Sequence, residues 1–298
     1  MHKQDIIYTL LLMPGINNNW NKTQKMSYST LFSLQDKVIV VTGGTGILGK
    51  AFIEGIVSFG GTAVIVGRNE EEGNKRAAEI NANSGKALFI KGNVLDEKDM
   101  EKVRDITLEK FGSIDGLVNG AGGNMPQGVI QPDQDVFDMN IDGLRQVLDL
   151  NLMGTIIPTK IIGSAMAKQN GGSIVNISSV SAKQVITKVL GYSIGKAGVD
   201  CFTKWMAVET AKRHGDKIRV NSIMPGFFLT EQNRTLLTNP DGSYTERGTL
   251  VIKKTPDNRM GKPDELIGAL IYLLSDASKF VNGTDIGVDG GFVAFGGV

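Results

Sequence analysis

A run of β-branched residues that leads directly into a glycine-rich turn is the feature that most constrains the fold of this chain. Val38–Val41 form a continuous apolar run, which is typical of a parallel strand buried on both faces. The turn Thr42–Gly49 follows at once, and apolar residues from Leu48 to Phe59 then recur at spacings of three and four, which predicts a helix. A second apolar run, Ala63–Val66, completes a unit of strand, turn, helix and strand. Such a unit is typical of dinucleotide binding, because glycines let a pyrophosphate approach the backbone at a helix N-terminus.

The alternation of apolar strands and amphipathic helices continues along the chain, which predicts an α/β fold with a doubly wound parallel sheet in a single domain. Further strands are expected over Leu88–Lys91, Leu117–Asn119, Ser173–Ile177, Ile218–Ile223 and Ile286–Val288, and further helices over Glu70–Ala82, Glu97–Phe111, Gly143–Lys168, Tyr192–Lys212 and from Pro263. Pro158 removes one helical hydrogen bond, so a loosened turn is expected near Asn151. The long segment Phe227–Lys262 is predicted to be irregular and to act as a lid or binding loop.

The composition argues against several classes of function. The chain has 298 residues, with 32 basic against 31 acidic side chains and no long basic run, so a nucleic-acid-binding surface is not expected. The single cysteine, Cys201, cannot form an intramolecular disulfide and fits a reducing, cytoplasmic location. The two histidines, His2 and His214, cannot build a metal cluster, so we expect no metal site.

Residues 1–30 differ from the rest of the chain and are rich in asparagine. Their apolar run Ile6–Met13 is too short to span a bilayer, so no membrane anchor is expected. We predict that residues 1–30 are either a disordered extension or the product of a start codon assigned too far upstream. The folded domain is predicted to cover residues 31–298.

The stretch Ser178–Lys196 carries residues suited to proton transfer. Tyr192 and Lys196 are four positions apart, so on a helix the phenol and the ammonium share one face about one turn apart. A nearby cation favours the ionised phenol and lowers its pKa, so Tyr192 can donate a proton to a carbonyl oxygen. The hydroxyl of Ser179 could hold the same oxygen. The alternative is an ordinary Tyr-x-x-x-Lys pair on an exposed helix face.

The residues that follow the second strand bear on the choice of dinucleotide. An enzyme that prefers NAD often has a carboxylate here to bind the ribose 2′-hydroxyl, but this chain reads Gly67-Arg68-Asn69. Arg68 could pair with a 2′-phosphate, which favours NADP over NAD. An arginine here could also stack on adenine, which leaves NAD open.

Five landmarks occur together and in order. They are the turn Thr42–Gly49, the segment Asn119–Gly122, Asn151, Ser179 with Tyr192 and Lys196, and Pro225–Gly226 followed by Thr230. With these landmarks the chain from about residue 31 onward resembles the classical short-chain dehydrogenase/reductases. The resemblance implies a Rossmann-like sheet of about seven parallel strands with helices on both faces. It also implies a hydride moved between NAD(P) and a carbonyl or alcohol, in an enzyme that is typically a homotetramer.

The resemblance assigns roles to four residues. Tyr192 would be the acid or base, and Lys196 would hold the nicotinamide ribose and lower the pKa of Tyr192. Ser179 would orient the substrate oxygen. Asn151 would anchor a water that relays protons through Lys196.

The resemblance also implies a set of residues around the dinucleotide. They are Thr42, Gly43, Gly46, Ile47, Gly49, Arg68, Asn93, Val94, Asn119, Ala121, Gly122, Tyr192, Lys196, Pro225, Gly226, Phe228 and Thr230. Two of them depart from the family pattern. Ile47 stands where a glycine is usual, and Asn93 stands where an aspartate is commoner.

Two loops narrow the resemblance further. Gly120–Asn124 and Pro225–Arg234 are similar to the loops of the D-mannonate oxidoreductase (fructuronate reductase) subgroup. That subgroup implies reduction of D-fructuronate, whose carboxylate lies several atoms from the ketone and needs a cation at the far end of the pocket. Arg234 is the first candidate because its planar fork matches a carboxylate, and Asn124 and Lys183 are further candidate substrate residues.

Other interpretations stay open. Arg234 could pair with Glu231 and never meet the substrate. The small polar ketone could be another sugar or polyol, or a 3-oxoacyl thioester. A protein of another class, one that binds a dinucleotide without catalysis, is also possible, but the presence of Ser179, Tyr192 and Lys196 argues against it.

Overall fold

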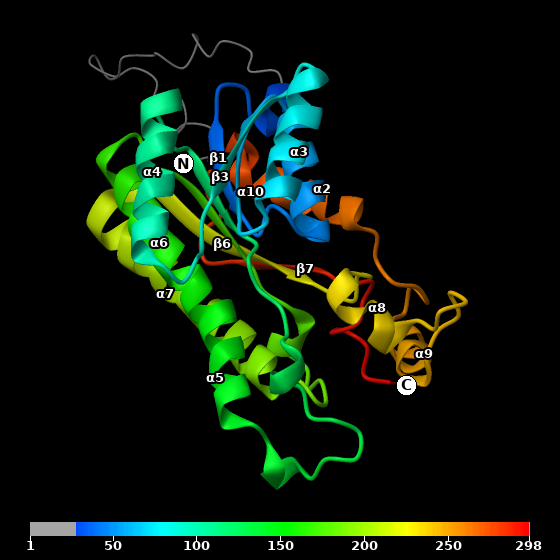
Figure 1. Cartoon of the computed structure of the whole chain (residues 1–298). Coiled ribbons are helices and arrows are strands. Elements are labelled where there is room, and N and C mark those ends of the chain that lie inside the picture. The colour runs from blue at the N-terminus through cyan, green and yellow to red at the C-terminus, as the bar shows by residue number, and fades with distance from the viewer. Residues whose placement is uncertain (1–27, 298) are drawn as a thin grey trace, which may run out of the picture. The chain divides into compact units, whose positions relative to one another are not determined.

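A computed structural model describes residues 28–297 of the chain (Figure 1). The elements from Phe32 onward belong to one compact unit. The extension predicted for residues 1–30 lies almost entirely outside the described residues, so its disorder and its start codon stay predictions.

The centre of the fold is a sheet of seven parallel strands in the order β3-β2-β1-β4-β5-β6-β7. The strands are β1 (Val38–Thr42), β2 (Thr62–Gly67), β3 (Lys86–Lys91), β4 (Gly116–Asn119), β5 (Gly172–Ile177), β6 (Ile218–Pro225) and β7 (Asp285–Val288). Val40 of β1 pairs with Val64 of β2 on one side and with Leu117 of β4 on the other. The chain thus winds from β1 to one edge of the sheet and then crosses back to build the other half. This is the predicted Rossmann-like, doubly wound sheet.

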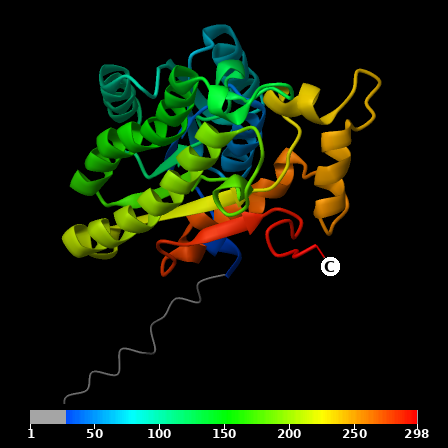
Figure 2. The same cartoon turned by 90° about the horizontal axis from the view of Figure 1, so that it is seen from below.

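Helices cover both faces of the sheet, as Figures 1 and 2 show. They are α2 (Ile47–Ser58), α3 (Glu70–Ala82), α4 (Glu97–Phe111), α5 (Ile141–Leu148), α6 (Gly154–Lys168), α7 (Leu190–His214), α8 (Glu231–Leu237), α9 (Glu246–Lys254) and α10 (Ile267–Leu274). Alternate residues of β1 face opposite layers. Ile39 and Val41 belong to the core shared with α2 and α10. Val38 and Val40 belong to the core shared with α4 and α6.

The predicted strands and most predicted helices are confirmed, with ends that move by one or two residues. The last helix begins as predicted at Pro263, but its first turn is a 3₁₀ turn over Pro263–Leu266 that continues into α10. Two segments differ more.

The predicted helix Gly143–Lys168 is interrupted by one π-helical turn, Asp149–Met153, between α5 and α6. Pro158 lies inside α6 and has no N–H to donate to the carbonyl four residues earlier. The loosened turn expected near Asn151 is therefore confirmed, and it holds Asn151 fully buried.

The segment Phe227–Lys262 was predicted to be irregular, and this prediction is wrong because the segment contains α8 and α9. Each helix has a local start signal. The Asn233 side chain accepts a hydrogen bond from the backbone N–H of Thr230, and the Thr245 side chain accepts one from that of Gly248. Leu237 and Val251 then pack into a small core of their own. Helices this short show too few turns for their periodicity to stand out in the sequence.

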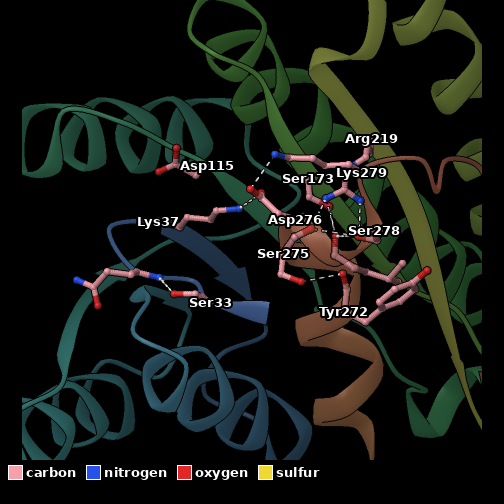
Figure 3. Close-up of polar contacts among 12 residues, drawn as sticks. Ser33, Lys37, Asp115, Ser173, Arg219, Tyr272, Ser275, Asp276, Ser278 and Lys279 are labelled. Carbon is pink, nitrogen blue, oxygen red and sulfur yellow. Dashed lines mark hydrogen bonds and ion pairs between the residues drawn. The ribbon is translucent and has the colours of Figure 1, made fainter. Parts of the chain in front are cut away.

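The amino ends of the strands are tied together by polar contacts (Figure 3). Lys37, just before β1, forms an ion pair of 2.9 Å with Asp276, just after α10. Arg219 of β6 donates to the hydroxyl of Ser278 at 2.8 Å and to the carbonyls of Leu273 and Ser275 at 2.9 and 3.1 Å. These carbonyls lie at the C-terminal end of α10, where helical partners are missing. This end of the sheet is therefore built for stability.

We expect Arg219→Met to lower the free energy of unfolding by about 1–3 kcal/mol, because it removes the charged donor from the carbonyls of Leu273 and Ser275. These carbonyls then keep only the weaker hydrogen bonds from the hydroxyls of Ser173 and Ser278. Urea unfolding followed by circular dichroism measures the change. Arg213→Met is the matched control, since Arg213 is an exposed arginine paired with Glu209 on the last turns of α7, and its replacement should cost less than about 0.5 kcal/mol. Equal costs for the two variants would contradict the assignment.

Candidate active site

The glycine turn after β1 lies against the loop after β4. β1 and β4 are neighbours in the sheet, and from them the chain continues toward opposite edges. Sheets of this kind bind ligands at the point between two such strands. Gly43 has a φ of +67°, and a Cβ atom on it would lie 2.6 Å from the carbonyl oxygen of Gly120. A Cβ atom on Gly49 would collide with the carbonyl of Gly43. The close approach of the two loops therefore requires Gly43, and the tightness of the turn itself requires Gly49.

The N-terminus of α2 opens from this turn without a cap. Gly46 is the N-cap and has no side chain to offer, and no acidic residue stands in the first turn. The first backbone N–H groups and the positive end of the helix dipole are thus available to a pyrophosphate. Ile47, which stands where the family has a glycine, is the first residue of the helix and is half-buried. The turn and the open helix end fit the phosphates of a dinucleotide.

Arg76 of α3 is a residue that the sequence interpretation missed. Its guanidinium donates to the carbonyls of Gly44 and Gly46 at 2.7 Å each and to Glu72 at 2.8 Å. The side chain is buried, which is rare for arginine without such partners. Arg76 therefore fixes the backbone of the glycine turn from outside. Its position beside Gly73 and Ala77 on the buried face of α3 was the available signal.

The other predicted cofactor residues lie at the carboxyl ends of their strands. The Thr42 hydroxyl accepts a hydrogen bond of 3.3 Å from the backbone N–H of Ala121, which links the loops after β1 and β4. Arg68 is exposed after β2 and makes no hydrogen bond or ion pair with the described residues. Asn93 is exposed after β3, and Val94 beside it is buried.

Asn119 has partners within the protein, and its contact with the dinucleotide stays a prediction. Its side chain is buried and donates to Thr159 and to Asn176 at 2.8 Å each. Asn176 donates in turn to Thr203 of α7 at 2.9 Å. Asn119 therefore lies inside a polar ladder that joins β4, β5 and α7, and it does not line the cavity described next.

A cavity of about 580 Å³ opens at the carboxyl ends of β4, β5 and β6. Its wall includes Ser179 after β5 together with Tyr192 and Lys196 on α7. The Ser179 hydroxyl lies close enough to the Tyr192 phenol to lower its pKa by hydrogen bonding. The Lys196 Nζ lies 5.6 Å from the centre of the Tyr192 ring and donates to the carbonyl of Ile177 at 2.7 Å. The structure thus brings together the three residues that the spacing predicted.

Further predicted residues line the same cavity. Gly122 lies on it, and a Cβ atom there would be 2.7 Å from the Asn151 Oδ1 and 3.1 Å from the Lys196 Nζ. From the loop after β6, Pro225, Gly226, Phe228 and Thr230 complete the predicted set on this wall.

Asn151 supports the cavity from behind. Its side chain donates to the carbonyls of Gly123 and Val147 at 2.7 and 2.8 Å and accepts from the N–H of Gly123 at 3.0 Å. Because the whole amide is engaged in holding the loop after β4, a role in a water relay stays a prediction.

Burial dominates the ionisation of the two catalytic candidates. It raises the pKa of Tyr192 above the ordinary value, and the hydrogen bond with Ser179 offsets part of this rise. Burial also lowers the pKa of Lys196 from 10.5 to about 8, against the opposing charge of Asp200. The expected lowering of the Tyr192 pKa by Lys196 is wrong for this structure. The desolvation of the phenol is the largest effect on its pKa, and the Lys196 ammonium is directed to the carbonyl of Ile177 instead.

Lys183 does not reach the cavity, which corrects its prediction as a substrate residue. Its ammonium pairs with Asp200 of α7 at 2.5 Å and with Asp285 of β7 at 3.3 Å, and the hydrogen bond to Asp200 leads the effects that raise its pKa. Asp200 also accepts a short hydrogen bond from Ser178, and Asp285 accepts one of 2.9 Å from Ser222. The positive charge of Lys183 is thus paired with carboxylates of the protein itself.

Arg234, the first candidate for the substrate carboxylate, is exposed on α8 and does not line the cavity. Its alternative partner, Glu231, has a side chain outside the described residues. Asn124 does line the cavity, and its Oδ1 is buried without a hydrogen-bond partner. The arginine on the cavity wall is instead Arg247 of α9. The sequence interpretation missed it because the pattern of residues 227–262 predicts no helix.

Comparison with known proteins places this site in a family. Residues 45–293 match a family model described as enoyl-(acyl carrier protein) reductase. The chain is 39% identical over 275 residues to the uncharacterized oxidoreductase UxuB of Bacillus subtilis, which covers 89% of this chain and 98% of that protein. This chain belongs to the short-chain dehydrogenase/reductases. As a short-chain dehydrogenase/reductase it is an NAD(P)-dependent oxidoreductase that acts on CH–OH groups.

Two solved structures resemble this short-chain dehydrogenase/reductase closely. One is a protein of Haemophilus influenza, provisionally described as a D-mannonate oxidoreductase and solved with bound NAD. It is 37% identical, with a TM-score of 0.82 over 89% of this chain and 98% of that one. The other is a gluconate 5-dehydrogenase of Burkholderia cenocepacia in complex with NADP and tartrate. It is 30% identical, with a TM-score of 0.79 over 89% of this chain and 98% of that one.

Two negative findings concern residues 28–297. No helix in that range is long and apolar enough to cross a membrane. No group of histidine, cysteine, aspartate or glutamate side chains there could hold a metal ion.

Proposed function

We propose that this short-chain dehydrogenase/reductase interconverts D-fructuronate and D-mannonate. The observation that carries the proposal is that Ser179 and Tyr192 lie together on the cavity wall, with Lys196 one helical turn further along α7. Two hydroxyls at one point can hold a single carbonyl oxygen. The similarity to a protein provisionally described as a D-mannonate oxidoreductase supports a sugar acid as the substrate.

The proposed roles follow from this geometry. The hydroxyls of Ser179 and Tyr192 hold the ketone oxygen of the substrate, and Tyr192 gives up its proton as that oxygen becomes an alcohol. The ammonium of Lys196, 5.6 Å from the centre of the Tyr192 ring, places a positive charge near the phenolate left behind. When bound, the dinucleotide supplies the hydride. Asn151 keeps the loop after β4 in place, because its amide is bonded to both polar groups of the Gly123 backbone.

Unpartnered polar atoms on the cavity wall support a substrate with several hydroxyl groups. The Asn124 Oδ1 and the Ser181 Oγ are both buried without a hydrogen-bond partner, and both residues line the cavity. Buried polar atoms normally have a partner, so each is suited to a substrate hydroxyl. An acyl chain would leave both atoms unpaired, which disfavours a 3-oxoacyl thioester.

A substrate panel tests the proposal. Oxidation of NADH and NADPH is followed with D-fructuronate, D-fructose and an acetoacetyl thioester, and the product of D-fructuronate is identified by chromatography. We expect D-fructuronate to have the highest kcat/KM and to yield D-mannonate. A preference for D-fructose or for the thioester would remove the sugar-acid assignment and leave a reductase of another ketone. Dinucleotide binding without turnover on any substrate would favour the non-catalytic alternative.

We propose NADP as the preferred dinucleotide, with NAD as the alternative. Gly67 provides no carboxylate for a ribose 2′-hydroxyl, and the guanidinium of Arg68 is exposed and unpaired among the described residues. A 2′-phosphate at the end of β2 would find a cation there. The relatives bind NAD in one case and NADP in the other.

We expect Arg68→Ala to raise the KM for NADPH by roughly 5- to 150-fold, since a charge-assisted contact worth about 1–3 kcal/mol is lost. The KM for NADH should change much less. Steady-state kinetics with both dinucleotides measure the effect. A wild-type enzyme with equal KM values for the two would count against a 2′-phosphate at Arg68.

The remaining proposals concern the whole molecule. We propose that residues 31–298 form the catalytic domain, that the protein lies in the cytoplasm, and that it assembles as a homotetramer. The exposed apolar side chains Ile194, Trp205 and Val208 on α7 support assembly through this helix. Light scattering after size exclusion tests the oligomeric state.

A further inference from the structure

Arg247 occupies the cavity wall on the side formed by α9. It is half-buried, and it shares the cavity with Ser179, Tyr192 and Asn124. We propose that Arg247 binds the carboxylate of the substrate and makes the enzyme selective for keto acids over neutral ketoses. This inference deepens the proposed function, on which it rests for the identity of the substrate.

The bonds of Arg247 leave its charge uncompensated. Its two Nη atoms donate to the hydroxyl and to the carbonyl of Thr187 at 3.2 and 3.1 Å, and both acceptors are neutral. Among the described residues it forms no ion pair, which sets it apart from Arg213 and Arg259. Its burial lowers its pKa, which reflects the cost of a charge held away from water. A guanidinium in such a site gains from an anion that replaces one of these long contacts.

The charge of the cavity supports the same inference. Its described lining residues include two cations, Lys196 and Arg247, and no aspartate or glutamate. Lys196 is already bonded to the carbonyl of Ile177 beside the reacting centre. Arg247 is therefore the cation that remains for a group remote from the ketone. Its planar fork suits the two oxygens of a carboxylate.

The two elements that meet at Arg247 show how it would act. Thr187 lies in the loop between Ser179 and α7, whereas Arg247 belongs to α9, after β6. The side chain thus links the segment after β6 to the loop before Tyr192. A substrate whose carboxylate is bound by Arg247 would have its ketone held at a fixed distance from the hydroxyls of Ser179 and Tyr192. Binding of a remote group positions the reacting group in this way.

Direct binding tests the inference without turnover. D-Mannonate and its neutral counterpart, D-mannitol, are titrated by calorimetry into the full-length enzyme saturated with oxidised dinucleotide. We expect Arg247→Ala to weaken the binding of D-mannonate by roughly 10- to 150-fold, the range for loss of a hydrogen bond to a charged group. D-Mannitol should stay within about threefold of wild type, and Arg247→Lys should fall between, because it keeps the charge and loses the fork.

Two further variants exclude a merely structural role. Arg234→Ala is the matched control, an exposed arginine on the neighbouring helix, and should leave both affinities unchanged. Thr187→Val removes one acceptor that competes for the guanidinium, so D-mannonate should bind as well as in wild type or better. If Arg247 only ties the Thr187 loop to α9, both Thr187→Val and Arg247→Ala should weaken the binding of D-mannonate and of D-mannitol alike.

The outcomes separate this inference from the proposed function. Loss of D-mannonate binding in Arg247→Ala alone supports the inference, even if the wild-type enzyme does not turn D-fructuronate over. Equal losses for D-mannonate and D-mannitol overturn it, as does a wild-type enzyme that fails to bind D-mannonate. Turnover of D-fructuronate with unchanged D-mannonate affinity in Arg247→Ala overturns the inference and leaves the proposed function standing.

Discussion

Tyr192→Phe is expected to lower kcat by roughly 100- to 10,000-fold, the range for removal of a general acid or base. The substitution keeps the ring and removes only the hydroxyl, which lies close to that of Ser179. Because the ring stays, the affinity for the dinucleotide should remain within about threefold of wild type. Stopped assays with D-fructuronate give kcat, and fluorescence titration gives the dinucleotide affinity.

The residual turnover of Tyr192→Phe should no longer follow the titration of a phenol, because that group is gone. Ser179→Ala is a companion variant, since it removes the second hydroxyl from the same oxygen and should cost less than Tyr192→Phe. Turnover of Tyr192→Phe within tenfold of wild type, in a folded protein, would remove the proposed mechanism.

Lys196→Met is expected to abolish measurable turnover while it leaves the protein as stable as wild type at pH 7, or more stable. The ammonium of Lys196 is buried, with the side chain only 4% exposed, and its pKa falls from 10.5 to about 8. The lowered pKa means that protonated Lys196 destabilises the folded state by on the order of 3 kcal/mol. Loss of the hydrogen bond to the Ile177 carbonyl offsets part of the gain, by about 1–3 kcal/mol.

The pH dependence of stability gives Lys196→Met a clear signature. Lys196 is a base whose pKa is lower in the folded state, so the folded protein binds this proton less tightly than the unfolded chain does. The penalty is fully present below pH 8 and disappears between pH 8 and 10.5. The stability of Lys196→Met relative to wild type should therefore fall by on the order of 3 kcal/mol from pH 7 to 10.5. Urea midpoints measured across this range test it, and a difference that does not change with pH would contradict it.

Those residues that could be predicted from the sequence share one property: their function depends on local spacing. Tyr192 and Lys196 lie one turn apart on α7 because four residues separate them, and Ser179 follows a strand that the apolar run marks. The glycine turn was likewise recognisable, because Val38–Val41 directly precede it. In each case the chain near the residue decides where it lies.

The residues that were placed wrongly, or missed, depend on partners far away in the sequence. Lys183 has the positive charge expected of a substrate-binding residue, but it forms an ion pair with Asp285, about a hundred positions later in the chain. Arg234 and Arg247 cannot be ranked until the ends of α8 and α9 are known, because one turn of a short helix decides which guanidinium faces the cavity. The net pKa of Tyr192 likewise depends on burial by the whole fold.

The ion pairs of Lys183 have a consequence for the order in which the enzyme matures. Lys183 lies in the loop that starts at Ser179, and its ammonium is held both by Asp200 on the catalytic helix and by Asp285 at the start of the last strand. A ribosome makes Asp285 only after nearly all of the chain has been made. The nascent chain can therefore build the dinucleotide-binding half early and pair Lys183 with Asp200, but the second ion pair of the Ser179 loop forms only when the last strand has joined the sheet. The loop that begins at the catalytic candidate Ser179 thus gains its second anchor only when synthesis is nearly complete.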